Sequence, residues 1–186
     1  MHPQAAALIE RHGMLLLPVE GTFVARTYTS ERELPDGTPL ATAILGLYVD
    51  DPPSRSLFHR LDRDEVWNFH RGDPLRLVLL HPGGATDEVV LGPDPGQHAQ
   101  WLVPAGTWQA GELIAGGSWA LFGCTVVPGF TDACFEGGAV STLLVGYPDR
   151  ADDIRRLGVP DGAPTRLANG PQATGERPGV GVRDPA

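Results

Sequence analysis

The chain has 186 residues, a hydrophobic fraction of 41%, and 14 basic against 23 acidic residues, which gives a net charge of −9. This composition is typical of one globular domain, whereas an acidic chain without a basic cluster is poorly suited to nucleic acid or an anionic membrane surface. No apolar run reaches the roughly 18–20 residues that span a bilayer, and the N-terminus lacks a signal-peptide pattern, so we expect a cytoplasmic protein.

The first predicted element is a helix over residues 3–12, because Pro3 suits a first helical turn and Gly13 suits the end of a helix. Short β-branched or alternating segments follow at about ten-residue spacing, each bounded by Gly, Pro or Asp. This rhythm predicts an all-β sandwich or barrel. The expected strands cover residues 14–17, 22–29, 40–49, 56–61, 65–70, 75–81, 88–91, 100–103, 108–114 and 119–127.

Helical patterns return near the C-terminus. Apolar residues at helical spacing over 140–147 predict one helix. Residues 150–157 place acids before arginines, which matches the helix dipole and predicts a second. Residues 159–186 are rich in Gly and Pro and lack aromatic residues, so we expect a domain over 1–158 followed by a flexible tail over 159–186.

The two cysteines, Cys124 and Cys134, have no CxxC spacing. Two cysteines are also too few for a disulfide framework. We therefore expect reduced, buried thiols.

The segment most informative about chemistry is HRLDRDEVWNFHRG, residues 59–72. It resembles the first motif of the cupin superfamily, which runs His-x-His, three or four residues, Glu, six residues, Gly. His59, Glu65 and Gly72 occupy the first histidine, glutamate and glycine positions, and Leu61 stands at the second histidine.

A second segment, residues 103–113, resembles the second cupin motif. Pro104 and Gly106 match it, but Gln109 replaces the ligand histidine and Leu113 replaces the final asparagine. Transition metals prefer three or four nitrogen, carboxylate or thiolate ligands. His59, Glu65 and Gln109 are therefore only weak metal candidates, and we expect no tightly bound metal and no other cofactor.

Further segments between residues 15 and 136, including PVEGTF, RTYTS, LGPD and GCTVVPGFTDACFE, resemble one cupin subgroup, Cupin_5 (DUF985). The resemblance implies a cupin jelly-roll β-barrel, or double-stranded β-helix, that is commonly a homodimer. Its fold is similar to that of sugar-nucleotide epimerases, although most members lack an assigned reaction. The subgroup usually has histidine where this chain has Asn68.

The alternation of side chains along strands predicts the pocket, once the resemblance places His59 and Glu65 inside the barrel. Trp67 and Phe69 then point inward with Glu65, and Gln109 points inward while Trp108 faces away. Residues expected to close the pocket are Phe23, Arg26 and Tyr28. Such an interior suits an organic ligand held by apolar contacts and a few polar groups.

Each polar candidate has a functional and a structural interpretation. His59 could be a general acid or base, since imidazole titrates near neutrality, or a hydrogen-bonded core residue. Glu65 could be a base or a carboxylate paired with Arg26, Arg60 or another cation. Gln109 could orient a ligand, and Arg26 could meet an anionic substrate group or form a surface ion pair.

These residues support three hypotheses. The first is an enzyme that rearranges a small organic molecule by proton transfer, as an epimerase, isomerase, dehydratase or cyclase, with His59 and Glu65 as catalytic residues. The second is a metabolite-binding or sensor module. The third is a metal-dependent oxygenase or lyase.

Overall fold

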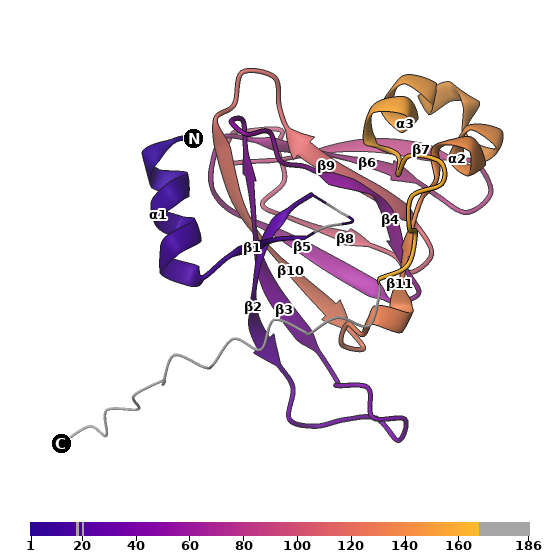
Figure 1. The fold of residues 1–186 in the computed structure, drawn as a ribbon, viewed down its shortest axis with the longest axis horizontal. Coiled ribbons are helices and arrows are strands. Elements are labelled where there is room, and N and C mark those ends of the chain that lie inside the picture. Colours follow the sequence, from indigo (N-terminus) through magenta and orange to yellow (C-terminus); the bar gives the residue numbers. More distant parts are fainter. Residues whose placement is uncertain (18, 20, 168–186) are drawn as a thin grey trace.

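The computed structural model describes residues 1–17, 19 and 21–167. Its strands form two antiparallel sheets whose inner faces share one core (Figure 1). The six-stranded sheet has the order β1-β2-β3-β10-β5-β8, and the five-stranded sheet has the order β11-β4-β9-β6-β7. The expected all-β class is therefore confirmed as two facing sheets with a few short helices.

The strands closely follow the segments predicted from the sequence. β4, β8 and β10 have the expected bounds, whereas β5 extends further at both ends. Their bounds are β1 Leu15–Leu16, β2 Phe23–Thr29, β3 Thr42–Val49, β4 Ser56–Leu61, β5 Asp64–Gly72, β6 Leu75–Leu80, β7 Thr86–Leu91, β8 Gln100–Val103, β9 Trp108–Leu113, β10 Trp119–Val127 and β11 Phe135–Gly137.

The core between the sheets is built by alternate residues of each strand. Trp67 and Phe122 of the six-stranded sheet stack with ring centroids 4.7 Å apart, and they pack against Leu77 and Leu79 of the five-stranded sheet. Gly111 leaves room for the hydroxyl group of Tyr48, since a Cβ there would lie 2.4 Å from that oxygen. The two inner faces therefore interdigitate at this point.

The helix α1, Pro3–His12, covers the outer face of the six-stranded sheet (Figure 1). Its Ala5 and Leu8 pack with Leu47 and Leu121, which point away from the core between the sheets. Gly13 ends the helix in the left-handed conformation, with φ of 57°, which glycine adopts without steric cost. The helix predicted from the sequence is confirmed at both ends.

The helices α2, Val140–Gly146, and α3, Ala151–Leu157, cover the outer face of the five-stranded sheet (Figure 1). Leu143, Ile154 and Leu157 pack against outward-facing side chains of β4, β6 and β9. A 3-10 turn, η2 Pro148–Arg150, joins the two helices. Both outer faces thus carry helices, and the interior is bounded by strands.

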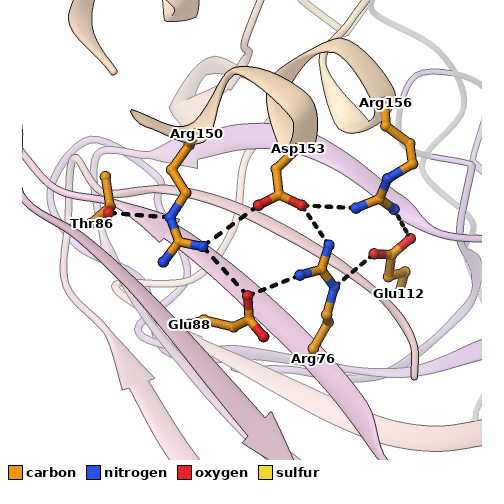
Figure 2. Close-up of polar contacts among 7 residues, drawn as sticks. All are labelled: Arg76, Thr86, Glu88, Glu112, Arg150, Asp153 and Arg156. Atoms are coloured by element: carbon orange, nitrogen blue, oxygen red, sulfur yellow. Dashed lines mark hydrogen bonds and ion pairs between the residues drawn. The ribbon is translucent and has the colours of Figure 1, made fainter. Parts of the chain in front are cut away.

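A network of ion pairs connects η2 and α3 to the strands beneath them (Figure 2). Arg76 of β6 donates to Glu112 of β9 at 2.8 Å and to Glu88 of β7 at 2.9 Å. Arg76 also donates to Asp153 of α3 at 2.5 Å, and Arg156 donates to the same carboxylate at 2.8 Å. The charged network comprises Arg76, Glu88, Glu112, Arg150, Asp153 and Arg156.

The sequence did not predict β11 or the 3-10 turn η1, Asp132–Cys134, before it. Both are short, and β11 depends on pairing with β4. The chain also stays packed beyond the expected boundary at residue 158, because the Gly137 amide donates to the Thr165 carbonyl at 2.7 Å. Residues 168–186 of the predicted tail lie outside the described residues.

Two further expectations concern the cysteines and membrane spans. Cys124 and Cys134 are both buried and unbridged, as predicted. No helix in the described part of the chain is long and apolar enough to cross a membrane.

Glu112→Gln should lower the free energy of unfolding by about 1–3 kcal/mol at neutral pH, because two arginines lose a charged acceptor. Burial alone would raise the pKa of Glu112, but hydrogen bonds from Arg156 and Arg76 outweigh it and hold the pKa below its usual value. A lowered carboxyl pKa adds stability above the unfolded pKa that is lost as pH falls through the folded pKa. The difference from wild type in urea unfolding should therefore shrink in acid.

Glu10→Gln on the exposed face of α1 is the control, and it should change stability by no more than about 0.5 kcal/mol. A Glu112→Gln effect that stayed constant from pH 7 to pH 3 would contradict the assigned role of this carboxylate.

Candidate functional site

The three residues singled out by the two motifs meet in the interior. His59 on β4 and Gln109 on β9 are direct partners across the strand pair, so their side chains point to the same face. Glu65 on β5 reaches them from the opposite sheet and contacts Gln109. Their exposed fractions are 4%, 1% and 6% respectively, so the expected convergence of these residues is observed.

Trp67 fixes the orientation of the Gln109 amide. The indole Nε1 donates to Gln109 Oε1 at 2.8 Å, and because an indole N–H can only donate, the amide oxygen must face it. The amide Nε2 then donates to Glu65 Oε2 at 2.5 Å. The result is a buried chain of hydrogen bonds from Trp67 through Gln109 to Glu65, which we call the interior hydrogen-bond chain.

The tautomer of His59 follows from its hydrogen bond. Its Nδ1 lies 2.8 Å from the carbonyl oxygen of Leu57, which can only accept, so Nδ1 carries the proton and the neutral ring has its lone pair on Nε2. Every fully buried side-chain nitrogen or oxygen of the described residues has a hydrogen-bond partner. Nε2 has none among those residues, so it borders space that water can reach.

His59 also stacks on Phe135, with ring centroids 5.4 Å apart and an angle of 16° between the planes. Phe135 is fully buried at the start of β11. Phe135 was not predicted as a site residue, because β11 was not predicted and no local sequence pattern places it beside His59. Stacking on Phe135 and the hydrogen bond at Nδ1 together restrict the orientation of the imidazole ring of His59.

An apolar cluster lies at the Glu65 end of the interior. Leu61 and Val126 lie within it, and Val126 is the strand partner of Glu65. Burial raises the pKa of the Cys134 thiol, and the negative charges of Asp62 and Glu65 add to this effect. The mouth cluster comprises Leu61, Val126, Cys134 and Phe135, with Val19, Phe130 and Leu167 packed against them.

The remaining expected pocket residues divide into two groups. Phe69 and Arg26 point into the interior, where Phe69 packs against the core. The expected interior position is wrong for Phe23, which packs beneath α1 on the outer face. It is also wrong for Tyr28, which is 53% exposed. A register shift between Arg26 and Tyr28 places Tyr28 on the outer face of the sheet, opposite to Arg26. Their roles as substrate-binding residues stay predictions.

Other expected orientations are as predicted. Trp108 faces away from the interior, where the Cζ of Arg60 lies 4.4 Å from its ring centroid. Arg60 pairs with Glu136 through two hydrogen bonds of 2.9 and 2.8 Å, so it is not the partner of Glu65. Asn68 faces outward and accepts from Gln100 at 2.6 Å.

The residues at the metal-ligand positions of the cupin motifs do not fit a metal. Leu61 has no donor atom, and Gln109 Oε1 already accepts from Trp67. Among the residues that the structure describes, no group of three or more His, Cys, Asp or Glu side chains is arranged to hold a metal ion. His59 and Glu65 alone fall short of the three or four ligands such a metal prefers.

A depression of about 440 Å³ on the outer side of the five-stranded sheet is not the candidate site. Its two arginines, Arg76 and Arg156, already form ion pairs with Glu112 of the charged network. Their guanidinium groups are therefore occupied by protein acceptors. The lining residues are Arg76, Glu88, Val90, Glu112, Leu113, Ile114, Ala115 and Arg156.

Trp67→Phe should lower the free energy of unfolding by about 1–3 kcal/mol, because the buried Gln109 oxygen loses its donor. Trp101→Phe is the matched control: Trp101 is the strand partner of Trp67 and borders the same core, yet its indole nitrogen has no hydrogen bond to a described residue. Chemical denaturation should show a clearly smaller loss for Trp101→Phe. Equal losses would contradict the role given to the Trp67 N–H.

Leu61→His combined with Gln109→His should create a metal site, since four donors would then converge. Metal analysis after incubation with Zn²⁺ or Mn²⁺ should find about one equivalent in the double variant and far less in wild type. A full equivalent in the wild-type protein would show that His59, Glu65 and Gln109 suffice.

A family model and two solved structures are similar to this chain in sequence and fold. The family model Cupin_5, described as "Cupin superfamily (DUF985)", matches residues 6–137. A protein of Shewanella oneidensis with an X-ray structure is 32% identical, with a TM-score of 0.77 over 84% of this chain and 98% of that one. A hypothetical protein from Leishmania major is 26% identical, with a TM-score of 0.75 over 83% and 98%. No curated protein matches the chain. The chain therefore belongs to the Cupin_5 family of the cupin superfamily.

Proposed function

We propose that this cupin binds a small organic molecule between its two sheets and rearranges it by proton transfer, with His59 and Glu65 as the catalytic residues. The observation that carries the proposal is the hydrogen bonding of the His59 imidazole, which fixes its tautomer. Its Nδ1 is held by the Leu57 carbonyl, and its Nε2 keeps a free lone pair beside water-accessible space. An oriented imidazole of this kind is the usual general base or acid near neutral pH.

Glu65 supplies the second titratable group. The Gln109 amide holds one carboxylate oxygen through Nε2, and Trp67 holds the amide in turn. Gln109 thus acts as a positioning residue for Glu65. A fixed carboxylate and a fixed imidazole reaching the interior from opposite sheets could remove a proton from one side of a substrate and return it on another.

The reaction classes that need only such groups are epimerisation, isomerisation, dehydration and cyclisation. The aromatic and aliphatic side chains around the pair, including Trp67 and Phe135, would exclude water from a bound substrate. The mouth cluster lies at the Glu65 end. Entry of a substrate would therefore require displacement of side chains such as Phe130.

A second candidate function is metabolite binding without turnover. One observation favours it: Trp67, Gln109 and Glu65 satisfy one another, and such a closed chain can simply stabilise a polar interior. Under this alternative, His59 would bind the ligand through Nε2 and leave it unchanged.

The proton-transfer proposal predicts exchange of substrate hydrogen with solvent. We expect wild-type protein in D₂O to incorporate deuterium beside the carbonyl group of one or more members of a panel of ketoses, keto acids and cyclic ketones, followed by proton NMR. His59→Gln and Glu65→Gln should each slow this exchange about 100-fold or more.

His70→Gln is the control, because His70 is exposed on β5, the strand that also carries Glu65, and exchange should be unchanged. Undiminished exchange in His59→Gln and Glu65→Gln would rule out their catalytic roles. Ligand-induced NMR shifts without any exchange would favour the binding module instead.

A further inference from the structure

Arg26 brings a cation to the interior side of the six-stranded sheet. It is the strand partner of Ile44, and Ile44 packs against the core that contains Trp67. Directly opposed residues on neighbouring strands share one face of the sheet. The side chain of Arg26 therefore leaves β2 on the same face as the candidate catalytic residues.

The guanidinium group of Arg26 has no hydrogen bond and no ion pair with any of the residues that the structure describes. Arg60 of β4 and Arg63 of the turn that follows it both donate to protein acceptors. Arg26 instead lies over the ring of Phe130, with its Cζ 5.6 Å from the centroid. An arginine with all five donors unused in a partly buried position requires an explanation.

Burial lowers the pKa of Arg26, and the negative charge of Asp132 only partly opposes that effect. Removing a cation from water costs free energy unless it gains a paired anion with good geometry. Asp132 attracts the guanidinium from beyond ion-pair distance. The fold therefore keeps a costly charge in place without giving it a bonded partner.

The donors of Arg26 are also reachable. Fully buried side-chain nitrogen atoms in the described part of the chain all have hydrogen-bond partners, so the unpartnered nitrogen atoms of Arg26 must border space open to water. A guanidinium presents its donors as a planar fork that matches the two oxygens of a carboxylate or phosphate. This is the chemistry of an anion receptor.

Phe130 places this guanidinium beside the candidate site. Its ring lies under Arg26 and packs against the cluster that contains Val126, the strand partner of Glu65. Cys134 and Phe130 both belong to the mouth cluster. Arg26 and Glu65 thus flank the same small region at one end of the interior.

We infer that Arg26 is a binding residue for a carboxylate or phosphate group of the substrate, so that the molecule accepted between the sheets is a small organic anion. The inference rests on the proposed function for the existence of an interior ligand, but not on turnover. The anionic group would bind at the mouth through the guanidinium, which would place the rest of the molecule toward His59 and Glu65.

The test compares benzoate, its neutral analogue benzamide, and inorganic phosphate as probes of the full-length protein by isothermal titration calorimetry at low ionic strength. Wild type should bind benzoate or phosphate but not benzamide, and the two anions distinguish a carboxylate from a phosphate preference. Arg26→Gln should weaken anion binding about 10-fold or more. Asp132→Asn should strengthen it, because a competing negative charge is removed.

Arg71→Gln is the matched control, since the Cζ of Arg71 also lies 5.6 Å from an aromatic centroid, that of Trp119, but on the exposed outer side. Binding by this variant should equal that of wild type. Without ligand, the melting temperature of Arg26→Gln should equal or exceed that of wild type, because the substitution removes an unpaired, partly buried charge.

The inference is overturned if wild type binds neither anion at tens of millimolar, if benzamide binds as well as benzoate, or if Arg26→Gln retains full affinity. A lowered melting temperature of Arg26→Gln together with unchanged binding would assign Arg26 a structural role. Failure of deuterium exchange in the earlier experiment would leave these binding measurements unaffected, so the two proposals can fail separately.

Discussion

The interior of this protein depends on one donor-only group, the indole N–H of Trp67. Because it cannot accept, it forces the oxygen of Gln109 toward itself and the amide nitrogen toward Glu65. Neither the amide nor the carboxylate can then rotate without losing a buried hydrogen bond, which is costly in a site of low dielectric. The position of Glu65 is thus set by a residue on its own strand acting through a residue of the opposite sheet.

Because side chains alternate along each strand, the interior hydrogen-bond chain lies on the opposite face of the sheets from the side chains that pack against the helices. Inward residues meet across the two sheets, and outward residues meet α1 on one side and α2 with α3 on the other. Charged side chains such as Arg76 and Glu112 are paired on the outer side, beneath α3 (Figure 2). The outer faces therefore add apolar packing and ion pairs to the core between the sheets.

The polar groups of the interior do not make up the ligand set that a transition metal prefers. A leucine and an internally bonded glutamine occupy two positions where metal-binding cupin motifs have histidine, so His59 and Glu65 remain as a pair of titratable groups. The unpartnered guanidinium of Arg26 adds a fixed positive charge at one end. The interior therefore carries an imidazole, a carboxylate and a guanidinium whose donors have no partner among the described residues.

Local chemistry made the elements predictable from the sequence. Gly, Pro and Asp mark the strand ends, so β4, β8 and β10 were predicted at their observed bounds. The motif spacing and period of two likewise placed Glu65, Trp67 and Gln109 on inward faces. Only the tertiary structure revealed the bond from Trp67 to Gln109, the stacking of Phe135 on His59 and the reversal of Tyr28. These depend on register shifts and on contacts between residues as many as 76 positions apart, here 59 and 135, which local sequence patterns do not encode.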